Sequence, residues 1–521
     1  QGINQGPATN MGSISGYEAL GPYEVHITLS QPNVFFEGTL PKIPIVSAEA
    51  IEAGATSDDP WATDWFASNE AGSGPYTLES HSAETITMEG YPGYWRPFEP
   101  GTPTHVTLRT DPDITSAVLQ MCEGEIDMLG GLSPDDTTAA IQCDDVKSIV
   151  QARFGVGSVV FNMQTDGPTS DPLVRKAIAK AFDYEAWNEF YGGRTEAPTG
   201  PLPSNADIGP LPPESVRDVA GAKQLMAEAG YPDAGPDNIA FTISYAGIGG
   251  LSFEEFFGTL LQENLKEIGI GVEQVLVPWG QLVEMTSNPD TAADMAFLIL
   301  NMTSPDPSSL LKSGYITESF ADQGGYNWAY YSNALVDELT ASVATIADRE
   351  ERGLVLRQIQ DQMIDDQVAV WVPMAPIYQP VRDNWTVKYE PLDFVVSVRF
   401  FFARNTDNVA EAAAPAVVEL PYEPVVFSNI ASIPSIDPHI GYDSAAMLFI
   451  RSVYDSLLEF PPGSEPAISR AALATSWEWS DDGLGLTLQL REGVVFHDGY
   501  PFDSEDVIRS FERIQGINQG P

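Results

Sequence analysis

The side chains of this chain that offer chemistry are aromatic rings and neutral hydrogen-bonding groups, not a reactive set. Trp279 follows an apolar run in "VLVPWGQL", and Trp328 and Tyr330 stand among polar residues in "YNWAYYSN". Aromatic faces beside a few polar groups are typical of clefts that hold small ligands. Each position also has an ordinary structural interpretation, as a core tryptophan or as part of a turn before a helix.

Motifs for catalysis or metal binding are missing from the sequence. It contains no Gly-x-Ser-x-Gly elbow, no His-Glu-x-x-His pair and no phosphate-binding glycine loop. A glycoside hydrolase needs a pair of carboxylates, but among 74 acidic residues some pair always occurs, so such a pair is no evidence for this activity. A secreted carbohydrate-active enzyme stays the alternative. We expect no cofactor and no metal, because the five histidines are scattered along the chain, at His26, His81, His105, His439 and His497.

Composition indicates a folded, acidic protein of two or three domains. The 521 residues carry 25 Lys and Arg against 74 Asp and Glu, a net charge of -49, which excludes nucleic acid as a partner. The expected acidic coat suits a salty or acidic milieu. No apolar run approaches the roughly 18 residues of a membrane span. Cys122 and Cys143 are either two buried thiols or, in an exported protein, a disulfide.

The elements that must position these side chains are clearest between residues 240 and 277. Residues 240–246 alternate like a strand, Ser252 and Glu255 form a capping box, and residues 272–277 return as a strand. This pattern predicts a parallel, right-handed strand–helix–strand unit.

Helices and strands alternate along much of the chain, which predicts an α/β class. Asp171 and Pro172 mark the start of a helix that is expected to run to the Gly192-Gly193 stop. Further helices are expected over 214–229, 334–348 and 349–366, and a strand over 368–375.

Several blocks resemble the signature of the extracellular solute-binding proteins of family 5, which serve ABC importers. The most specific stretch runs from 473 to 514 and contains "SDDG", "LREG" and "FHDG". Other blocks that agree are "GSGPYTLES", "CEGEIDML", "DPLVRKAIAKAFDYEA", "SPDPSSLL" and "YYSNALVDEL". Together they span nearly the whole chain.

The order of these blocks differs from that of the family. Family members begin with a strand and an Asp-Pro turn, here residues 425–439, and the 473–514 block comes next. The heptapeptide "QGINQGP" occurs at both 1–7 and 515–521. The chain is therefore similar to a circular permutation of the family order, with the Ala-rich segment 404–420 as the linker at the junction.

The resemblance implies a periplasmic-binding-protein-like fold of two lobes plus an extra subdomain, with a ligand cleft between the lobes. One lobe would combine 74–163 with 386–454, and a subdomain would join 455–521 to 1–73. The other lobe would be 164–385. Two chain crossings between the lobes would form the hinge.

The resemblance also implies ligand contacts. Family members place a cleft aromatic at Trp279 and ligand-backbone contacts at Ser432 and Ile433, which could equally be plain strand. Peptide binders carry an aspartate at the position of Thr303, where Asn301 and Thr303 offer only neutral groups; Asp306 is an alternative carboxylate. Loss of that charge favours an oligosaccharide over a free-amino peptide. The expected ligand residues are Trp279, Asn301, Thr303, Trp328, Tyr330, Ser432 and Ile433.

The function that the resemblance implies is capture of a solute, an oligosaccharide or a peptide-like molecule, by hinge closure. The protein would not be an enzyme. Its partners would be the solute and an ABC permease, and the protein itself would be a monomer. It would lie in the periplasm or outside the cell, tethered to the membrane like a lipoprotein in its natural precursor. A peptide binder with a non-standard amino-group anchor is the further alternative.

Overall fold

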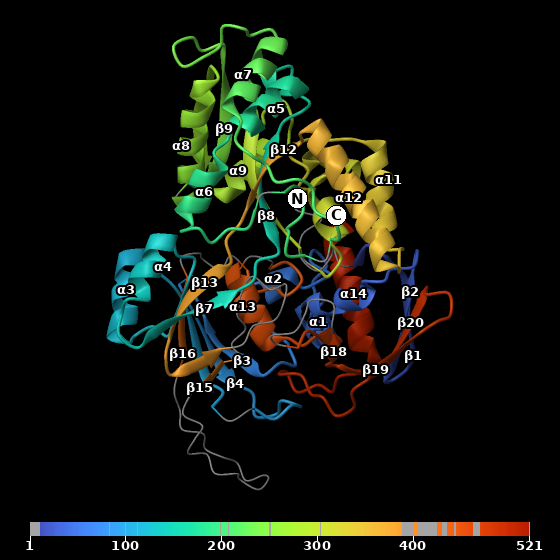
Figure 1. Cartoon of the computed structure of the whole chain (residues 1–521). Helices are drawn as coiled ribbons and strands as arrows, with labels where there is room; N and C mark the ends of the chain where they lie inside the picture. Colours follow the sequence, from blue (N-terminus) through green and yellow to red (C-terminus); the bar gives the residue numbers. More distant parts are fainter. Residues whose placement is uncertain are drawn as a thin grey trace. The chain divides into compact units, whose positions relative to one another are not determined.

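A computed structural model describes residues 11–519, apart from 83, 99–100, 112, 198, 207, 250–251, 303, 388–400, 404–424, 430–434, 442–443 and 462–468. The chain divides into two compact units (Figure 1). Among the described residues, unit 1 comprises 153–376, and unit 2 comprises 11–152 and 377–519. Within the described ranges, no helix has the length and apolar character needed to cross a bilayer.

Unit 1 is built on a five-stranded sheet in the order β10-β9-β11-β8-β12. Strand β9 is parallel to β10 and β11, whereas β8 runs antiparallel to both of its neighbours, β11 and β12. The strands are β8 (Gly155–Phe161), β9 (Phe241–Ile248), β10 (Ile270–Val277), β11 (Met295–Asn301) and β12 (Ala369–Pro373).

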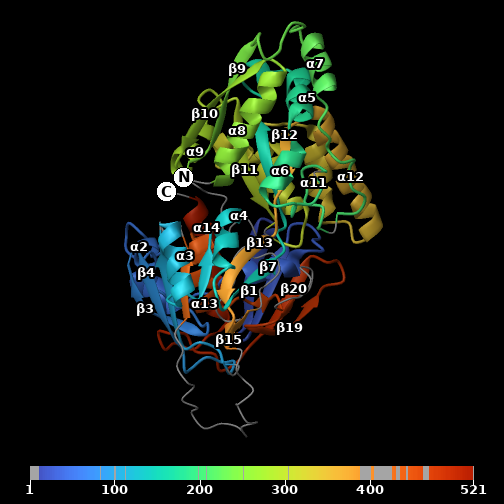
Figure 2. The ribbon, with the colours of Figure 1, turned by 60° about the vertical axis from the view of Figure 1, so that its left-hand side comes forward.

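Helices cover this sheet (Figure 2). Alternate strand residues, such as Val159 and Phe161 of β8, face a large apolar core that includes Phe257. On the other face, the Tyr315 hydroxyl is bonded to Ser158 Oγ at 2.7 Å and accepts from Trp371 Nε1 at 3.0 Å. The helices are α5 (Pro172–Ala181), α6 (Tyr184–Phe190), α7 (Val219–Glu228), α8 (Ser252–Glu267), α9 (Trp279–Thr286), α10 (Ser308–Gly314), α11 (Ala334–Val343) and α12 (Arg349–Asp366).

The strand–helix–strand prediction is confirmed in β9, α8 and β10, whose two strands pair in parallel from Phe241 opposite Ile270 to Ile248 opposite Val277. The predicted helix start at Asp171 is also confirmed, because its carboxylate accepts from the backbone nitrogen of Leu173 at 2.8 Å. Both features follow from short-range patterns of apolar spacing and capping.

Three helix boundaries differ from the prediction. The helix expected over 334–348 ends at Val343, and the other two differences come from acidic caps. The helix expected to run to Gly192 breaks after Ala181, because Asp183 starts a second helix by accepting from Ala186 N at 3.0 Å. The helix expected from residue 214 begins only at Val219, because Asp218 caps it by accepting from Gly221 N at 2.8 Å. In both cases a local acidic cap outcompetes continuation of the apolar period.

Unit 2 contains a seven-stranded sheet in the order β3-β4-β5-β16-β6-β13-β7. Strand β16 lies in its middle and pairs in parallel with both β5 and β6. The strands are β3 (Tyr76–His81), β4 (Thr85–Gly90), β5 (His105–Thr110), β6 (Met128–Gly130), β7 (Val146–Gln151), β13 (Ile377–Arg382) and β16 (Val425–Asn429).

A second, four-stranded antiparallel sheet of unit 2 has the order β1-β2-β20-β19. Its strands are β1 (Ile14–Gly21), β2 (Glu24–Leu29), β19 (Ala474–Trp479) and β20 (Gly485–Leu490). Two short pairs complete the strands of this unit: β14 (Trp385–Val387) with β15 (Phe401–Ala403), and β17 (Leu458–Glu459) with β18 (Arg470–Ala471). The helices are α1 (Ala48–Gly54), α2 (Thr63–Phe66), α3 (Ile114–Glu123), α4 (Pro134–Ala140), α13 (Ser444–Val453) and α14 (Ser504–Gln519).

A disulfide joins Cys122, at the end of α3, to Cys143, just after α4, with a Cα–Cα distance of 5.1 Å. From the sequence alone, the two cysteines could have been either buried thiols or a disulfide. The predicted linker 404–420 and the first copy of the heptapeptide lie outside the described residues. The predicted division at 73/74 and 454/455 falls inside unit 2 and stays a prediction.

Candidate functional site

One edge of the unit 1 sheet gathers most of the described candidate residues. Strands β9, β10, β11 and β12 all end at this edge, and the antiparallel β8 begins there. Ligands in open α/β sheets bind outside the carboxyl ends of the strands. Trp279 follows β10, Asn301 ends β11, and Arg153 stands two residues before β8.

Trp279 and Trp328 form an aromatic pair. Their ring centroids are 5.7 Å apart at an angle of 36°, and the Tyr326 ring lies 6.5 Å from that of Trp328. Trp328 is buried, with 2% of its surface exposed, whereas Trp279 is partly exposed. Trp328 therefore supports the ring of Trp279, which is the member of the pair that a ligand can reach.

Tyr330 is held within the protein interior. It has a left-handed backbone with φ of 51°, and its hydroxyl donates to the carbonyl oxygen of Thr286 at 2.9 Å. Asn327 fixes the same segment by donating to the carbonyl oxygens of Ile316 and Tyr331 at 2.9 and 2.8 Å. These contacts match the turn-ordering interpretation, and ligand contact by Tyr330 stays a prediction.

Asn301 lies against the backbone of the neighbouring strand. It pairs with Gly155, and a Cβ at Gly155 would overlap the side-chain oxygen of Asn301. Glycine at 155 is therefore what lets the Asn301 amide reach the start of β8. Thr303, the other neutral group expected here, lies outside the described residues, as do Ser432 and Ile433 of unit 2.

Asp306, the alternative carboxylate, is already engaged. It is 5% exposed, accepts from Ser308 N at 2.8 Å and from Ser308 Oγ at 2.6 Å, and pairs with Lys312 Nζ at 3.2 Å. Its charge therefore stabilises the start of α10, and it offers little to a ligand ammonium.

A pocket at the start of β8 was not found by sequence reasoning. It lies wholly within unit 1, and Arg153 is its principal charged group. Burial lowers the pKa of the Arg153 guanidinium, and the nearby Tyr191 partly offsets that effect. The lining residues are Arg153, Gly155, Val156, Glu196, Ala197, Thr199, Gly200, Leu202, Pro203, Ser204, Asn205, Trp371, Val372, Pro373, Met374 and Pro376.

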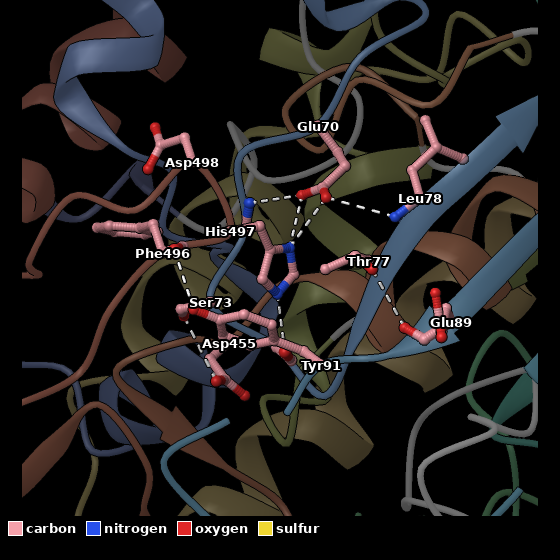
Figure 3. Close-up of polar contacts among 12 residues, drawn as sticks. Glu70, Ser73, Thr77, Leu78, Glu89, Tyr91, Asp455, Phe496, His497 and Asp498 are labelled. Carbon is pink, nitrogen blue, oxygen red and sulfur yellow. Dashed lines mark hydrogen bonds and ion pairs between the residues drawn. The ribbon is translucent and has the colours of Figure 1, made fainter. Parts of the chain in front are cut away.

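The Phe-His-Asp-Gly segment of unit 2 is structural (Figure 3). His497 is 4% exposed, and its Nδ1 lies 2.8 Å from a Glu70 carboxylate oxygen while its Nε2 lies 2.9 Å from the Gly74 carbonyl oxygen. Burial alone lowers the pKa of His497, but the charge and hydrogen bonds of Glu70 and Gly74 outweigh it and raise that pKa. Both ring nitrogens are occupied, and no cluster of metal-ligating side chains occurs among the residues that the structure describes.

Comparison with known proteins identifies the family. The model of the bacterial extracellular solute-binding proteins, family 5 (Middle), matches residues 1–321 and 470–521. The chain belongs to this family. The match falls in two segments, and both include part of unit 2. Strand β2 of the first segment pairs there with strand β20 of the second.

Family 5 relatives include the oligopeptide-binding protein AppA of Bacillus subtilis, 27% identical over 327 residues, which cover 59% of this chain and 56% of the relative. A probable di/tripeptide-binding protein of Pseudomonas aeruginosa is 26% identical over 376 residues, 70% of this chain and 66% of the relative. The chain thus spans less than two thirds of the length of these two relatives.

Two solved structures have a similar fold. The periplasmic binding protein DppA of Helicobacter pylori, in complex with the peptide STSA, has a TM-score of 0.66 at 20% identity, covering 77% of this chain and 76% of that one. AppA of Bacillus subtilis, in complex with a nonapeptide, has a TM-score of 0.63 at 22% identity, covering 77% and 81%. The mixed α/β, periplasmic-binding-protein-like fold predicted from the sequence is confirmed.

Proposed function

We propose that this protein is the extracytoplasmic substrate-binding component of an ABC importer, which captures its solute by closure of two lobes. The observation that carries the proposal is the family 5 match over 1–321 and 470–521. The partly exposed ring of Trp279, backed by Trp328, supports it by offering a surface on which a solute can stack.

The solute is a peptide-like molecule or an oligosaccharide. The relatives' names favour the peptide-like class, since they include oligopeptide, di/tripeptide and glutathione binders. The engaged state of Asp306 argues against a free ammonium held at that residue. Asn301, at the strand edge, suits a neutral hydrogen-bonding group of either class.

The remaining parts of the proposal follow from the family role. The protein works outside the cytoplasm, delivers its solute to a membrane permease, acts as a monomer and catalyses no reaction on the solute. The precursor is tethered to the membrane like a lipoprotein. The family segments stand in circularly permuted order along the chain. The two-part match supports this order, because residues 470–521 and the first part of 1–321 belong to the same unit, unit 2.

The test is binding without turnover. The full chain is mixed with a tripeptide pool, glutathione and an oligosaccharide pool, and bound species are identified by native mass spectrometry and confirmed by thermal shift. We expect one solute per chain, a raised melting temperature and unchanged solute mass after incubation. Steady conversion of any pool member would establish the enzyme alternative, and failure of every pool to bind would contradict the proposal.

A further inference from the structure

The pocket at the start of β8 combines apolar walls with one cation. Val156, Leu202, Pro203 and Trp371 are among its apolar lining, and Arg153 brings a guanidinium to the same space. The pocket also includes Pro376, so it lies where the chain enters unit 1 at Arg153 and leaves it at Pro376.

The guanidinium of Arg153 has no carboxylate partner among the residues that the structure describes. Its Nε is buried without a hydrogen-bond partner, and no described carboxylate forms an ion pair with it. The Asn205 side chain donates to the Arg153 backbone carbonyl at 3.1 Å, which fixes the main chain but not the guanidinium. Arg153 as a whole is partly exposed, but its Nε is buried. A buried charged donor without a partner is destabilising, and a ligand that pairs with it removes that cost.

Glu196 lies on the wall of this pocket but does not supply the missing charge. It accepts a hydrogen bond from the Ser204 hydroxyl instead. Three other arginines of unit 1 are engaged. Arg357 pairs with Asp361 at 2.8 Å and Arg217 pairs with Glu267 at 2.7 Å. The buried Arg175 donates from Nε, Nη1 and Nη2 to backbone carbonyl oxygens. Arg153 differs from these three in facing a pocket with no hydrogen-bond partner for its buried Nε among the described residues.

We propose that this pocket binds a carboxylate of the captured solute, with the Arg153 guanidinium as its charge partner. The inference rests on the proposed function and deepens it by naming the group that the solute must carry. An Arg fork matches a carboxylate geometrically, and the apolar walls suit the carbon atoms beside it. A phosphate dianion fits less well, because a single cation would face two charges beside the acidic Glu196.

The first experiment tests the anion site itself. Melting temperatures of the full chain are compared in sodium acetate, sodium phosphate and sodium chloride at equal ionic strength, for wild type, Arg153→Gln, Arg153→Lys and the control Arg357→Gln. We expect acetate to raise the melting temperature of wild type and of Arg357→Gln but not of Arg153→Gln, and Arg153→Lys to keep part of the rise. No acetate effect, an equal effect in all four proteins, or a phosphate effect larger than that of acetate overturns the proposal.

Stability without anion separates a binding role from a structural one. In chloride alone we expect Arg153→Gln to melt no lower than wild type, because the substitution removes an uncompensated charge. A marked loss of melting temperature in Arg153→Gln would make Arg153 a structural residue and overturn the proposal.

The second experiment links the pocket to the solute. Two tripeptide pools that differ only in a free carboxylate or a carboxamide at the C-terminus are titrated against the same four proteins. We expect wild type to bind the carboxylate pool about tenfold more tightly, and Arg153→Gln to lose that preference. Equal binding of both pools overturns the carboxylate inference and leaves the proposed function standing. Binding of neither pool, with the acetate effect present, contradicts a peptide solute while the anion site stands.

Discussion

The buried ion pair between Asp437 and Arg513 is the interaction whose loss we expect to affect the stability of unit 2 most. Both side chains are 0% exposed. Arg513 Nη1 and Nη2 donate to the two carboxylate oxygens at 2.8 and 2.5 Å, and Nε donates to the Trp61 carbonyl oxygen at 2.8 Å. The guanidinium also lies 4.2 Å from the centre of the Phe66 ring. The pair therefore fixes the end of α14 to two distant segments.

Asp437→Asn keeps the shape of the side chain but removes its charge. One carboxylate oxygen becomes an amide that donates, so it faces a donor of Arg513 and leaves the guanidinium buried without compensation. Breaking a buried pair in this way costs about 3–5 kcal/mol of the free energy of unfolding. The loss of stability should be the same in low and high salt, since water and ions do not reach the pair.

The assay is urea unfolding followed by circular dichroism, with amide hydrogen exchange in α14 to report unit 2 specifically. Arg509→Gln is the matched control, because Arg509 stands one turn earlier on α14 and pairs with Glu512 at partial exposure of 31% and 39%. That variant should change the free energy of unfolding by less than about 1 kcal/mol. If Asp437→Asn costs no more than Arg509→Gln, the argument from burial is wrong.

Three further predictions concern acid, ligand and salt. Burial lowers the pKa of His439 from 6.5 to about 3, so the unfolded chain binds the proton at a higher pH than the folded chain does. As the pH drops from 6.5 towards 3, this group should lower the free energy of unfolding by up to about 1.4 kcal/mol per pH unit. In urea unfolding at stepped pH, His439→Gln should remove that part of the pH dependence. Trp279→Ala should weaken solute binding at least about tenfold by titration while the circular dichroism spectrum is unchanged; equal affinity would refute its role. With a net charge of -49, the melting temperature should rise from low to molar salt, and a flat or falling trend would contradict the acidic-coat argument.

Local patterns predicted much of unit 1. The β9–α8–β10 unit and the cap at Asp171 depend on residues within about one helix length of each other, which the sequence displays directly. The breaks at Asp183 and Asp218 were missed, because an apolar period can continue through a residue whose side chain caps a new helix. The signal available in each case was an aspartate at the N-cap position, whose side chain accepts from the backbone amide three residues later.

The pocket around Arg153 could not have been predicted in the same way. Its walls come from the start of β8, from the loop 196–205 and from the end of β12, which are far apart in the sequence. A single arginine before an apolar strand carries no motif. Only pairing of β12 with β8, from Ala369 opposite Val160 to Pro373 opposite Val156, brings these segments together. Tyr330, chosen by local pattern, is buried with its hydroxyl bonded to the Thr286 carbonyl oxygen, and its ligand contact stays a prediction.

The sheets of unit 2 are compatible with the permuted segment order that we propose. Strand β16, from the late part of the sequence, lies between β5 and β6 and is parallel to both, so it is an interior strand of the sheet. Likewise β20 pairs with β2, from Glu24 opposite Gln489 to Thr28 opposite Gly485. Residues from both parts of the sequence share one apolar core, which includes Ile27, Leu488 and Phe511. Burial and strand pairing depend on which residues contact each other in the folded chain, not on their order along the sequence. The segments can therefore be permuted while the same sheets and core form.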